Sequence, residues 1–144
     1  MNERFLKIVN TLRLLSNDSH TQTAVVIVND DLEVISSGWN TIPVGVDDNK
    51  QSRFERPEKY YWFIHAEINA IARSAKNGIK IDGATMYMSC GIPCTDCAKA
   101  IINAGIKRII CTRNGGSKQE KWKEHFTRSM EMFNEAQVEV SFFD

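Results

Sequence analysis

Two short stretches of the chain carry side chains that commonly bind metal ions. They are HAE at 65–67 and PCTDC at 93–97. Cys94 and Cys97 are three residues apart, so on a helix they share one face and can bind one ion. They follow Pro93 at an expected helix start, where the partial positive charge of the helix end lowers the pKa of a thiol. One His with two Cys makes three ligands, and because zinc prefers four, one position is left for water.

Glu67 is the residue that indicates a catalytic metal site and not a purely structural one. It follows His65 by two residues and points to a different side of the expected helix, so it is badly placed as a further ligand. It can instead reach a water at the open zinc position as a proton carrier. HAE followed by PCTDC matches the H-x-E and P-C-x-x-C signature of zinc deaminases, and this match identifies the reaction class. We therefore predict His65, Cys94 and Cys97 as the ligands of one Zn²⁺ and Glu67 as the catalytic residue.

Simpler interpretations exist for each of these residue types. A lone C-x-x-C pair is also typical of redox-active or purely structural zinc sites, and a lone His in an apolar stretch usually only packs. The combination favours catalysis because both stretches begin helices that each lead to a strand. Cys90 and Cys111 are expected to be buried free thiols, and His20 and His125 to be surface or packing residues. The aromatic residues 60–63 can stack on a base but more often form core.

The elements that must position these residues follow from the spacing of apolar side chains. The pattern predicts helices over about 3–16, 60–77, 94–104 and 118–136, and strands over about 23–28, 32–40, 83–89, 106–112 and 138–143. This order indicates an α/β protein, a three-layer α/β/α sandwich with a five-stranded mixed sheet. The last strands should be parallel because each connection between them contains a helix. We expect residues 1–144 to form a single domain.

Composition excludes several classes of partner. The 18 basic and 18 acidic residues give a formal net charge of +0, which argues against nucleic acid or a membrane surface as a partner. The longest aliphatic run, AVVIV at 24–28, is too short to span a bilayer. The N-terminal stretch has charges among its apolar residues and no cleavage site of a signal peptide. Four Cys residues without an export signal indicate thiols or metal ligands, so we expect a cytoplasmic protein.

Longer stretches resemble the cytidine and deoxycytidylate deaminase superfamily, and specifically the deoxycytidylate (dCMP) deaminases. The resemblance covers most of the chain and includes TQT, GWNTIPVGVDD, RPEKY before HAEINAI, GATMY and PCTDCAKAIINAGIKRI. It implies zinc-dependent hydrolysis of the 4-amino group of dCMP, giving dUMP and ammonia, in pyrimidine deoxynucleotide supply. Asn40 matches the Asn that hydrogen-bonds sugar and base in that family, although a strand-end cap is its simpler role. The resemblance also implies a homo-oligomer, a hexamer or a dimer, controlled by dCTP with Mg²⁺ and by dTTP.

The long predicted loop at 41–59 is suited to substrate binding. A loop of this length in a compact domain is more often functional than idle. Arg53, Arg56 and Lys59 lie in it, shortly before the predicted metal ligands, and a nucleotide phosphate needs such cations. A solvated charged surface is the competing explanation for each of them. We add Ala66 to the predicted substrate-binding residues.

Three departures from the family pattern leave alternatives open. Thr41 stands where the family usually has Gly, the stretch MSCGI at 88–92 is one residue longer, and DSHTQTAVV at 18–26 is altered. Two departures touch regions linked to nucleotide control, so we expect a weak response or none to dCTP and dTTP. A zinc deaminase of cytosine, guanine or transfer-RNA adenosine is one alternative, and a non-catalytic zinc-binding paralogue is another. The neutral net charge counts against transfer RNA, and Glu67 counts against the paralogue.

Overall fold

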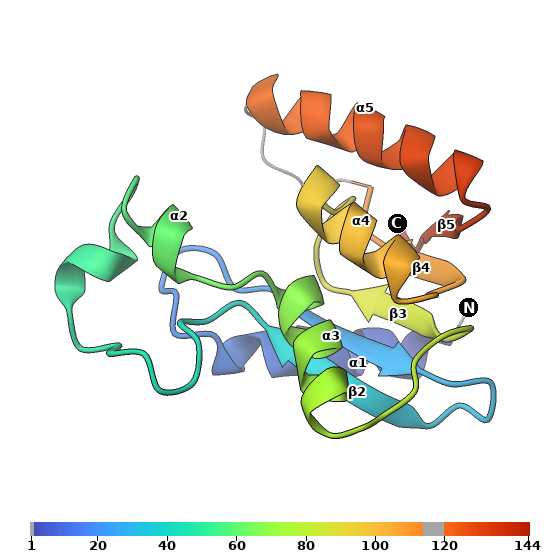
Figure 1. The fold of residues 1–144 in the computed structure, drawn as a ribbon, viewed down its shortest axis with the longest axis horizontal. Coiled ribbons are helices and arrows are strands. Elements are labelled where there is room, and N and C mark those ends of the chain that lie inside the picture. The colour runs from blue at the N-terminus through green and yellow to red at the C-terminus, as the bar shows by residue number, and fades with distance from the viewer. Residues whose placement is uncertain (1, 114–119) are drawn as a thin grey trace.

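A five-stranded mixed sheet forms the centre of the molecule (Figure 1). The computed structural model describes residues 2–113 and 120–144. The strands are β1 (Ala24–Val28), β2 (Val34–Trp39), β3 (Thr85–Met88), β4 (Arg108–Cys111) and β5 (Glu139–Phe142). Their order is β2–β1–β3–β4–β5, with β1 antiparallel to both of its neighbours and β3, β4 and β5 parallel. The predicted mixed sheet and its parallel half are confirmed.

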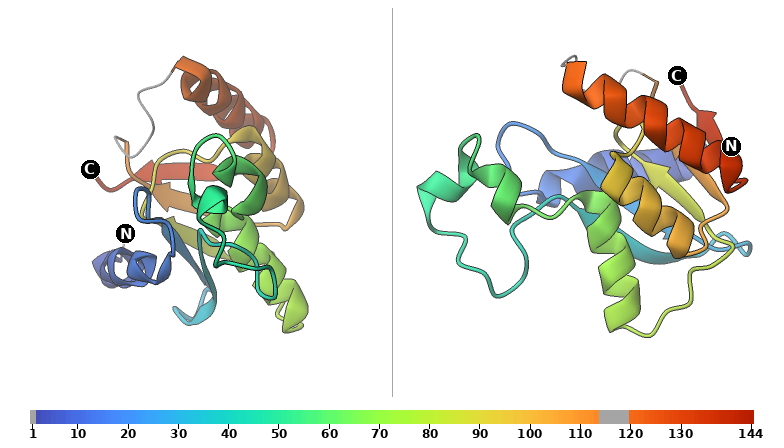
Figure 2. Two further views of the ribbon diagram at one scale, coloured as in Figure 1. Left: turned by 90° about the vertical axis from the view of Figure 1, so that its left-hand side faces the viewer. Right: turned by 45° about the horizontal axis from the view of Figure 1, so that its top comes forward.

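Helices cover both faces of this sheet, as the two views of Figure 2 show. The helix α1 (Glu3–Leu12) lies on one face, and α3 (Ala66–Lys76), α4 (Thr95–Asn103) and α5 (Glu120–Glu135) lie on the other. The predicted three-layer sandwich is therefore confirmed. Among the described residues, no helix combines the length and the apolar character needed to cross a membrane.

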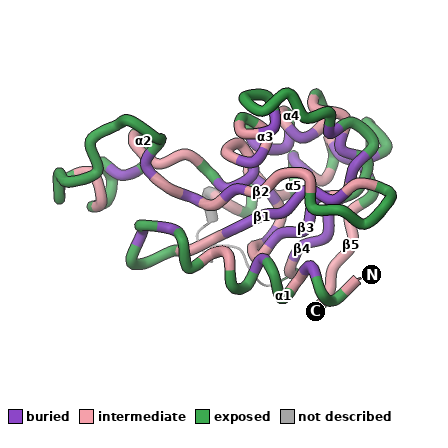
Figure 3. Tube along the Cα trace, turned by 90° about the horizontal axis from the view of Figure 1, so that it is seen from below, coloured by how far each residue is buried: buried purple, intermediate pink, exposed green. Residues whose placement is uncertain are grey.

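The interior strand β1 is buried along its whole length because helices cover it on both sides (Figure 3). Side chains alternate across a strand, so Val25 and Ile27 join the apolar cluster under α3 and α4. Val26 and Val28 join the smaller cluster under α1. Burial on both faces explains why the sequence of β1 is a continuous aliphatic run and not an alternating one.

The predicted continuous helix over 60–77 is wrong. The structure has a short helix, α2 (Lys59–Trp62), then an extended break, and then α3. The break forms because the backbone N–H of Ile64 donates to the carbonyl of Thr41 at 2.8 Å, and the N–H of Thr41 donates to the carbonyl of Ile64 at 3.3 Å. His65 is therefore extended and is the N-cap residue of α3, not a residue inside a longer helix.

Residues 41–64 form an arm that projects from the sheet and its helices (Figures 1 and 2). The arm contains the 3₁₀ helix η2 (Gln51–Phe54) as well as α2, and most of it is exposed. The guanidinium carbon of Arg53 lies 3.6 Å from the centroid of the Trp62 ring, which ties η2 to α2. Tyr61 is 81% exposed, so the expectation that residues 60–63 are core is wrong for it.

Candidate metal centre and substrate pocket

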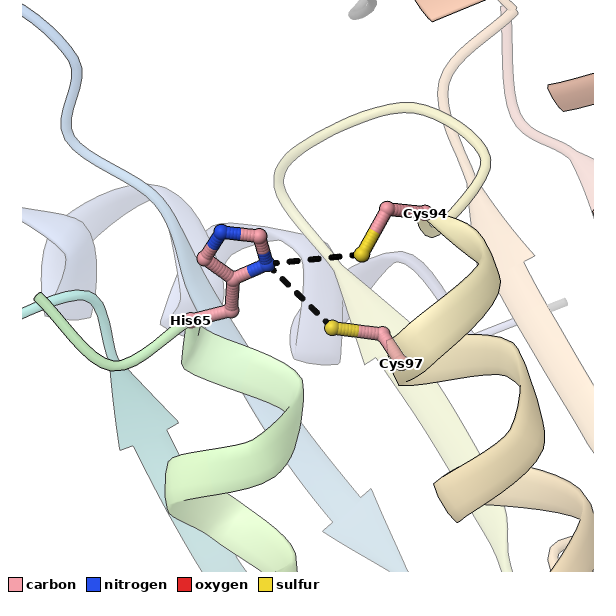
Figure 4. A group of neighbouring side chains, drawn as sticks. All are labelled: His65, Cys94 and Cys97. Atoms are coloured by element: carbon pink, nitrogen blue, oxygen red, sulfur yellow. Dashed lines mark hydrogen bonds between the residues drawn. The ribbon is translucent and has the colours of Figure 1, made fainter. Parts of the chain in front are cut away.

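Three predicted metal-binding side chains converge at one end of the sheet (Figure 4). Nδ1 of His65 lies 3.3 Å from Sγ of Cys97 and 3.6 Å from Sγ of Cys94. The three donor atoms all lie within 4.8 Å of one another, which is close enough for a single ion to contact all of them. One imidazole and two thiol sulfurs are donors that zinc accepts, so the residues fit the metal that the sequence predicts.

Helix starts bring these donors together. Cys94 is the N-cap residue of α4, with φ −63° and ψ 167°, and Cys97 is the third residue of that helix. His65 is the N-cap residue of α3. Side chains at the N-cap and three residues later meet above the first turn of a helix. Cys94 and Cys97 therefore lie close enough to bind one ion, as their i, i+3 spacing predicted. Cys94, however, is the cap residue of α4 and not a residue within the helix.

The charges of the three groups favour a bound cation. A hydrogen bond from the Cys97 thiol, with help from His65, lowers the pKa of Cys94 to about 4. The hydrogen bond to Cys94 raises the pKa of His65 to about 9. Donation to Cys94 and burial raise the pKa of Cys97. The three groups thus favour a thiolate at Cys94, and a metal ion that displaces the protons of His65 and Cys97 would be attracted by this negative charge.

Glu67 lies beside this centre in the first turn of α3. Its side chain is buried, with 5% of the residue exposed, and it lines the same cavity as His65 and Cys94. Burial raises the pKa of its carboxyl group. A carboxyl group with a raised pKa holds a proton more readily than an ordinary carboxyl group, which suits a general acid–base group. In the described part of the chain, the group of three metal-binding side chains does not include Glu67.

The position of α3 is fixed by its close approach to β2. Nδ2 of Asn69 donates to the carbonyl of Trp39 at 2.9 Å. Gly38 is required here, because a Cβ at this position would collide with the backbone of Ala66 and Ala70. Ala66 itself is fully buried, and its side chain is not part of the cavity lining. The interface therefore sets where the first turn of α3, with its carboxylate, lies over the sheet.

A cavity of about 250 Å³ connects the donor group to the arm. It is lined by Asp18, Thr21, Thr23, Asn40, Arg56, Lys59, Tyr60, Phe63, His65, Glu67, Cys90, Gly91, Ile92, Pro93, Cys94, Trp122 and Phe126. The sequence analysis named the arm cations and the metal centre separately, and the fold places Arg56 and Lys59 in the cavity wall with the centre. Arg53 is not in that wall, because its guanidinium stacks on Trp62 and donates to the carbonyl of Asp47 at 2.8 Å.

The two cations in the cavity wall differ in their partners. Nζ of Lys59 lies 2.7 Å from Oδ2 of Asp18, and the side chains are 7% and 6% exposed. Burial alone would raise the pKa of Asp18, but the hydrogen bond and charge of Lys59 lower it below its ordinary value. Arg56 is exposed and, within the described ranges, has no recorded ion pair or hydrogen bond. The positive charge of Arg56 is thus the more available one.

Asn40 caps a strand end, which is the simpler of the two roles considered for it, and it also faces the cavity. It is 8% exposed and lines the cavity. Its Oδ1 accepts a hydrogen bond from the N–H of Thr23 at 2.9 Å, and its Nδ2 donates to the carbonyl of Thr21 at 2.7 Å. These bonds cap the start of β1 and fix the orientation of the amide. An amide has a further lone pair and a further N–H, so Asn40 can still contact a molecule in the cavity.

Sequence reasoning missed several lining residues. Asp18 stands in a polar turn, and nothing local indicates that Lys59 would pair with it. Trp122 and Phe126 have the i, i+4 spacing of one helix face, which was the available signal, but the spacing does not tell which surface that face covers. Cys90 and Cys111 are free thiols, as predicted, but only Cys111 is buried, whereas Cys90 is half-buried and lines the cavity.

Comparisons with known proteins agree with this site. Residues 1–113 match the family model described as the cytidine and deoxycytidylate deaminase zinc-binding region. An uncharacterized deaminase of Aliivibrio fischeri is 32% identical over 139 residues, which cover 96% of this chain and 90% of that relative. The human deoxycytidylate deaminase is 34% identical over 113 residues, which cover 75% of this chain and 62% of the human protein.

A solved structure has the same fold. The crystal structure of dCMP deaminase from the cyanophage S-TIM5 in complex with dCMP and dUMP superposes with a TM-score of 0.76 at 24% identity. The match covers 98% of this chain and 95% of that chain. Because the family model spans the predicted metal donors and most of the sheet, the chain belongs to the cytidine and deoxycytidylate deaminase family.

Proposed function

We propose that the protein hydrolyses dCMP to dUMP and ammonia. One observation carries this proposal: a single cavity has His65, Cys94 and Glu67 in one wall, with the third donor Cys97 grouped with them, and the charge of Arg56 in another wall. The relatives named deoxycytidylate deaminase support the same substrate. This chain spans 62% of the human relative's length, so the substrate is carried over as part of the proposal.

His65, Cys94 and Cys97 would hold one Zn²⁺ in this proposal. When bound, the ion would supply a water that is activated near neutral pH. Glu67 would take up one proton from that water and deliver it to N3 of the pyrimidine ring. It would then take the proton of the hydroxyl formed at C4 and pass it to the leaving amine, so that ammonia leaves and the C4 carbonyl of dUMP forms. Its burial suits these transfers because a carboxyl group with a raised pKa gives up its proton less readily to solvent and can return it to the substrate.

The remaining lining residues would recognise the nucleotide. Arg56 would contact the phosphate, because its guanidinium carries the uncompensated charge of the cavity wall. Lys59 would contribute less to phosphate binding, since the carboxylate of Asp18 already neutralises its charge. Asn40, oriented by its two backbone contacts, would bond the sugar or the base. Arg53 and Ala66, which do not line the cavity, are left without a direct contact to substrate.

Ammonia release from a panel of dCMP, cytosine, guanine and adenosine tests the proposed base. We expect the highest catalytic efficiency with dCMP, and one zinc per chain in protein never exposed to a chelator. Faster turnover of guanine or adenosine would assign the pocket to another base. Protein that binds no zinc would refute the catalytic site itself.

We also propose a cytoplasmic homo-oligomer that serves pyrimidine deoxynucleotide supply and responds weakly or not at all to dCTP with Mg²⁺ and to dTTP. Thr41 supports the weak response. Its backbone pairs with Ile64, and its Oγ1 lies 3.2 Å from Oδ1 of Asn17, so a side chain occupies a place where glycine would leave the backbone open. The test is a dCMP saturation curve with and without each triphosphate. A sigmoidal curve that dCTP makes hyperbolic and dTTP suppresses would show that control is retained.

A further inference from the structure

The last helix of the chain contacts the residues on both sides of Cys94. Oγ of Ser129 donates to the carbonyl of Pro93 at 2.7 Å, and Ser129 is fully buried. One turn earlier on α5, Nδ1 of His125 accepts from the N–H of Thr95 at 3.3 Å and lies 3.0 Å from the Thr95 hydroxyl oxygen. Two side chains of one helix face therefore hold the backbone immediately before and immediately after Cys94.

The hydrogen bond from Thr95 to His125 satisfies a backbone N–H group at the start of α4. Cys94 occupies the N-cap position, where a Ser, Thr, Asp or Asn side chain would usually accept from the first N–H groups of the helix. Such a side chain accepts from the second or third N–H of the helix, whereas Thr95 is the first residue of α4. The N–H of Thr95 would otherwise lack a partner at a half-buried helix start. The His125 imidazole, reaching in from α5, supplies the acceptor that the metal-binding side chain does not.

The same face of α5 also closes the cavity. Trp122 and Phe126 line it, and Phe133, further along the helix, is fully buried in the core. The family model matches residues 1–113, so all of α5 lies after the matched region. The support of Cys94 by α5 therefore comes from a helix outside the region that the family model matches.

We propose that Ser129 and His125 are positioning residues that fix the Cys94 turn and thereby slow the loss of the metal. The proposal rests on the proposed zinc site. Ligands held by hydrogen-bonded neighbours are oriented before the metal arrives, and removing such neighbours typically costs about 10- to 100-fold in metal affinity. The bond to the Pro93 carbonyl restrains the chain before Cys94, and the bond from Thr95 restrains it after.

The rate of zinc transfer to an excess of a chromogenic chelator tests this role in the zinc-loaded full chain. Ser129→Ala removes the hydroxyl donor, and His125→Phe keeps a ring of similar size but removes the acceptor. We expect each variant to release zinc about 10- to 100-fold faster than the unaltered protein. His125→Asn should stay close to the unaltered rate, because its amide oxygen can take the place of Nδ1.

Two controls separate positioning from a general loss of stability. Phe133→Leu weakens the core contact of the same helix without touching Pro93 or Thr95, and Thr127→Ala removes an exposed hydroxyl that bonds only within α5. Both should release zinc at nearly the unaltered rate. Unchanged release from Ser129→Ala and His125→Phe would overturn the proposal, as would equally fast release from Phe133→Leu. Protein that binds no zinc would overturn the zinc site and this role together, whereas unchanged release would leave the zinc site standing.

Discussion

The cavity has two walls that are built in different ways. The catalytic wall consists of His65, Glu67 and Cys94, with the third metal donor Cys97 grouped with them. These residues lie in the caps and first turns of α3 and α4 and rest on the buried sheet. The arm wall belongs to residues 41–64 and projects away from the sheet. The catalytic wall is positioned by the helices α3 and α4 on the sheet. The arm wall is positioned mainly by single side-chain contacts, such as Lys59 with Asp18. Chemistry that depends on atomic distances thus has the rigid scaffold, while substrate selection is assigned to a loop.

The ion pair of Lys59 with Asp18 shows how the arm wall is held. The two residues are 41 positions apart, and their contact joins α2 to the turn that precedes β1. On the catalytic wall, by contrast, the decisive spacing is local, because Cys94 and Cys97 share one helix start. Changes in the catalytic wall should therefore remove turnover and leave stability, and changes in the arm wall should affect stability or substrate preference.

Glu67→Gln should have the largest effect on activity. The amide keeps the size of the side chain but cannot carry a proton, so turnover should fall by about 10²- to 10⁴-fold. Zinc content and the unfolding midpoint should stay near those of the unaltered protein. The measurements are the steady-state rate on dCMP, metal analysis and thermal unfolding. Near-normal turnover would place the proton carrier elsewhere.

Lys59→Met should act mainly on stability. It leaves Asp18 buried without its partner, and breaking a buried ion pair in this way typically costs about 3–5 kcal/mol of unfolding free energy. Urea unfolding measures the loss, and Lys50→Met, an exposed position of the same arm, is the control. If Lys50→Met costs as much, the ion pair is not what holds the arm.

The pH dependence sharpens the same prediction. The pKa of Asp18 is lower in the folded protein than its ordinary value of 3.8, so its contribution to stability is present above that pH and is lost as pH falls through the folded-state pKa. The destabilisation by Lys59→Met should therefore shrink in acid, where Asp18 can take up a proton. A destabilisation that is constant from neutral pH to pH about 3 would contradict the pairing.

Arg56→Ala should change substrate preference without changing chemistry. A charge-assisted contact to phosphate is worth about 1.5–3 kcal/mol, so kcat/KM for dCMP should fall by about 10- to 100-fold. The rate on deoxycytidine, which has no phosphate, is the internal control and should stay constant. An equal loss of kcat/KM on both substrates would mean that Arg56 stabilises the pocket and does not contact the phosphate.

Arg53→Ala should have the smallest effect. Its guanidinium stacks on Trp62 at the surface of the arm, and an exposed cation–π contact is worth about 0.5–1 kcal/mol. We expect a small drop in the unfolding midpoint and a kcat/KM for dCMP within a factor of a few of the unaltered protein. A loss as large as that of Arg56→Ala would place Arg53 at the phosphate after all.

The catalytic wall could be predicted from sequence because its signals are local. Cys94 and Cys97 are set by a helix start, and the order of helices and strands, predicted from the spacing of apolar residues, sufficed for the layers of the sandwich. The loop at 41–59 was predicted, but the rest of the arm up to residue 64 was not, because the backbone pairing of Thr41 with Ile64 overrides the helical pattern after residue 60. The roles of Asp18 and of α5 depend on contacts between distant segments, which spacing along the chain does not encode. The extent of the domain, residues 1–144, stays a prediction.

The pair of kcat/KM values of the unaltered protein for dCMP and deoxycytidine tests the central claim most directly. That claim is that one cavity combines a zinc wall acting on the base with an arm that selects the phosphate. We predict that dCMP is preferred by about 10- to 100-fold, the value of one charge-assisted phosphate contact. Equal efficiency on nucleotide and nucleoside would contradict it, because the arm would then contribute nothing to the choice of substrate.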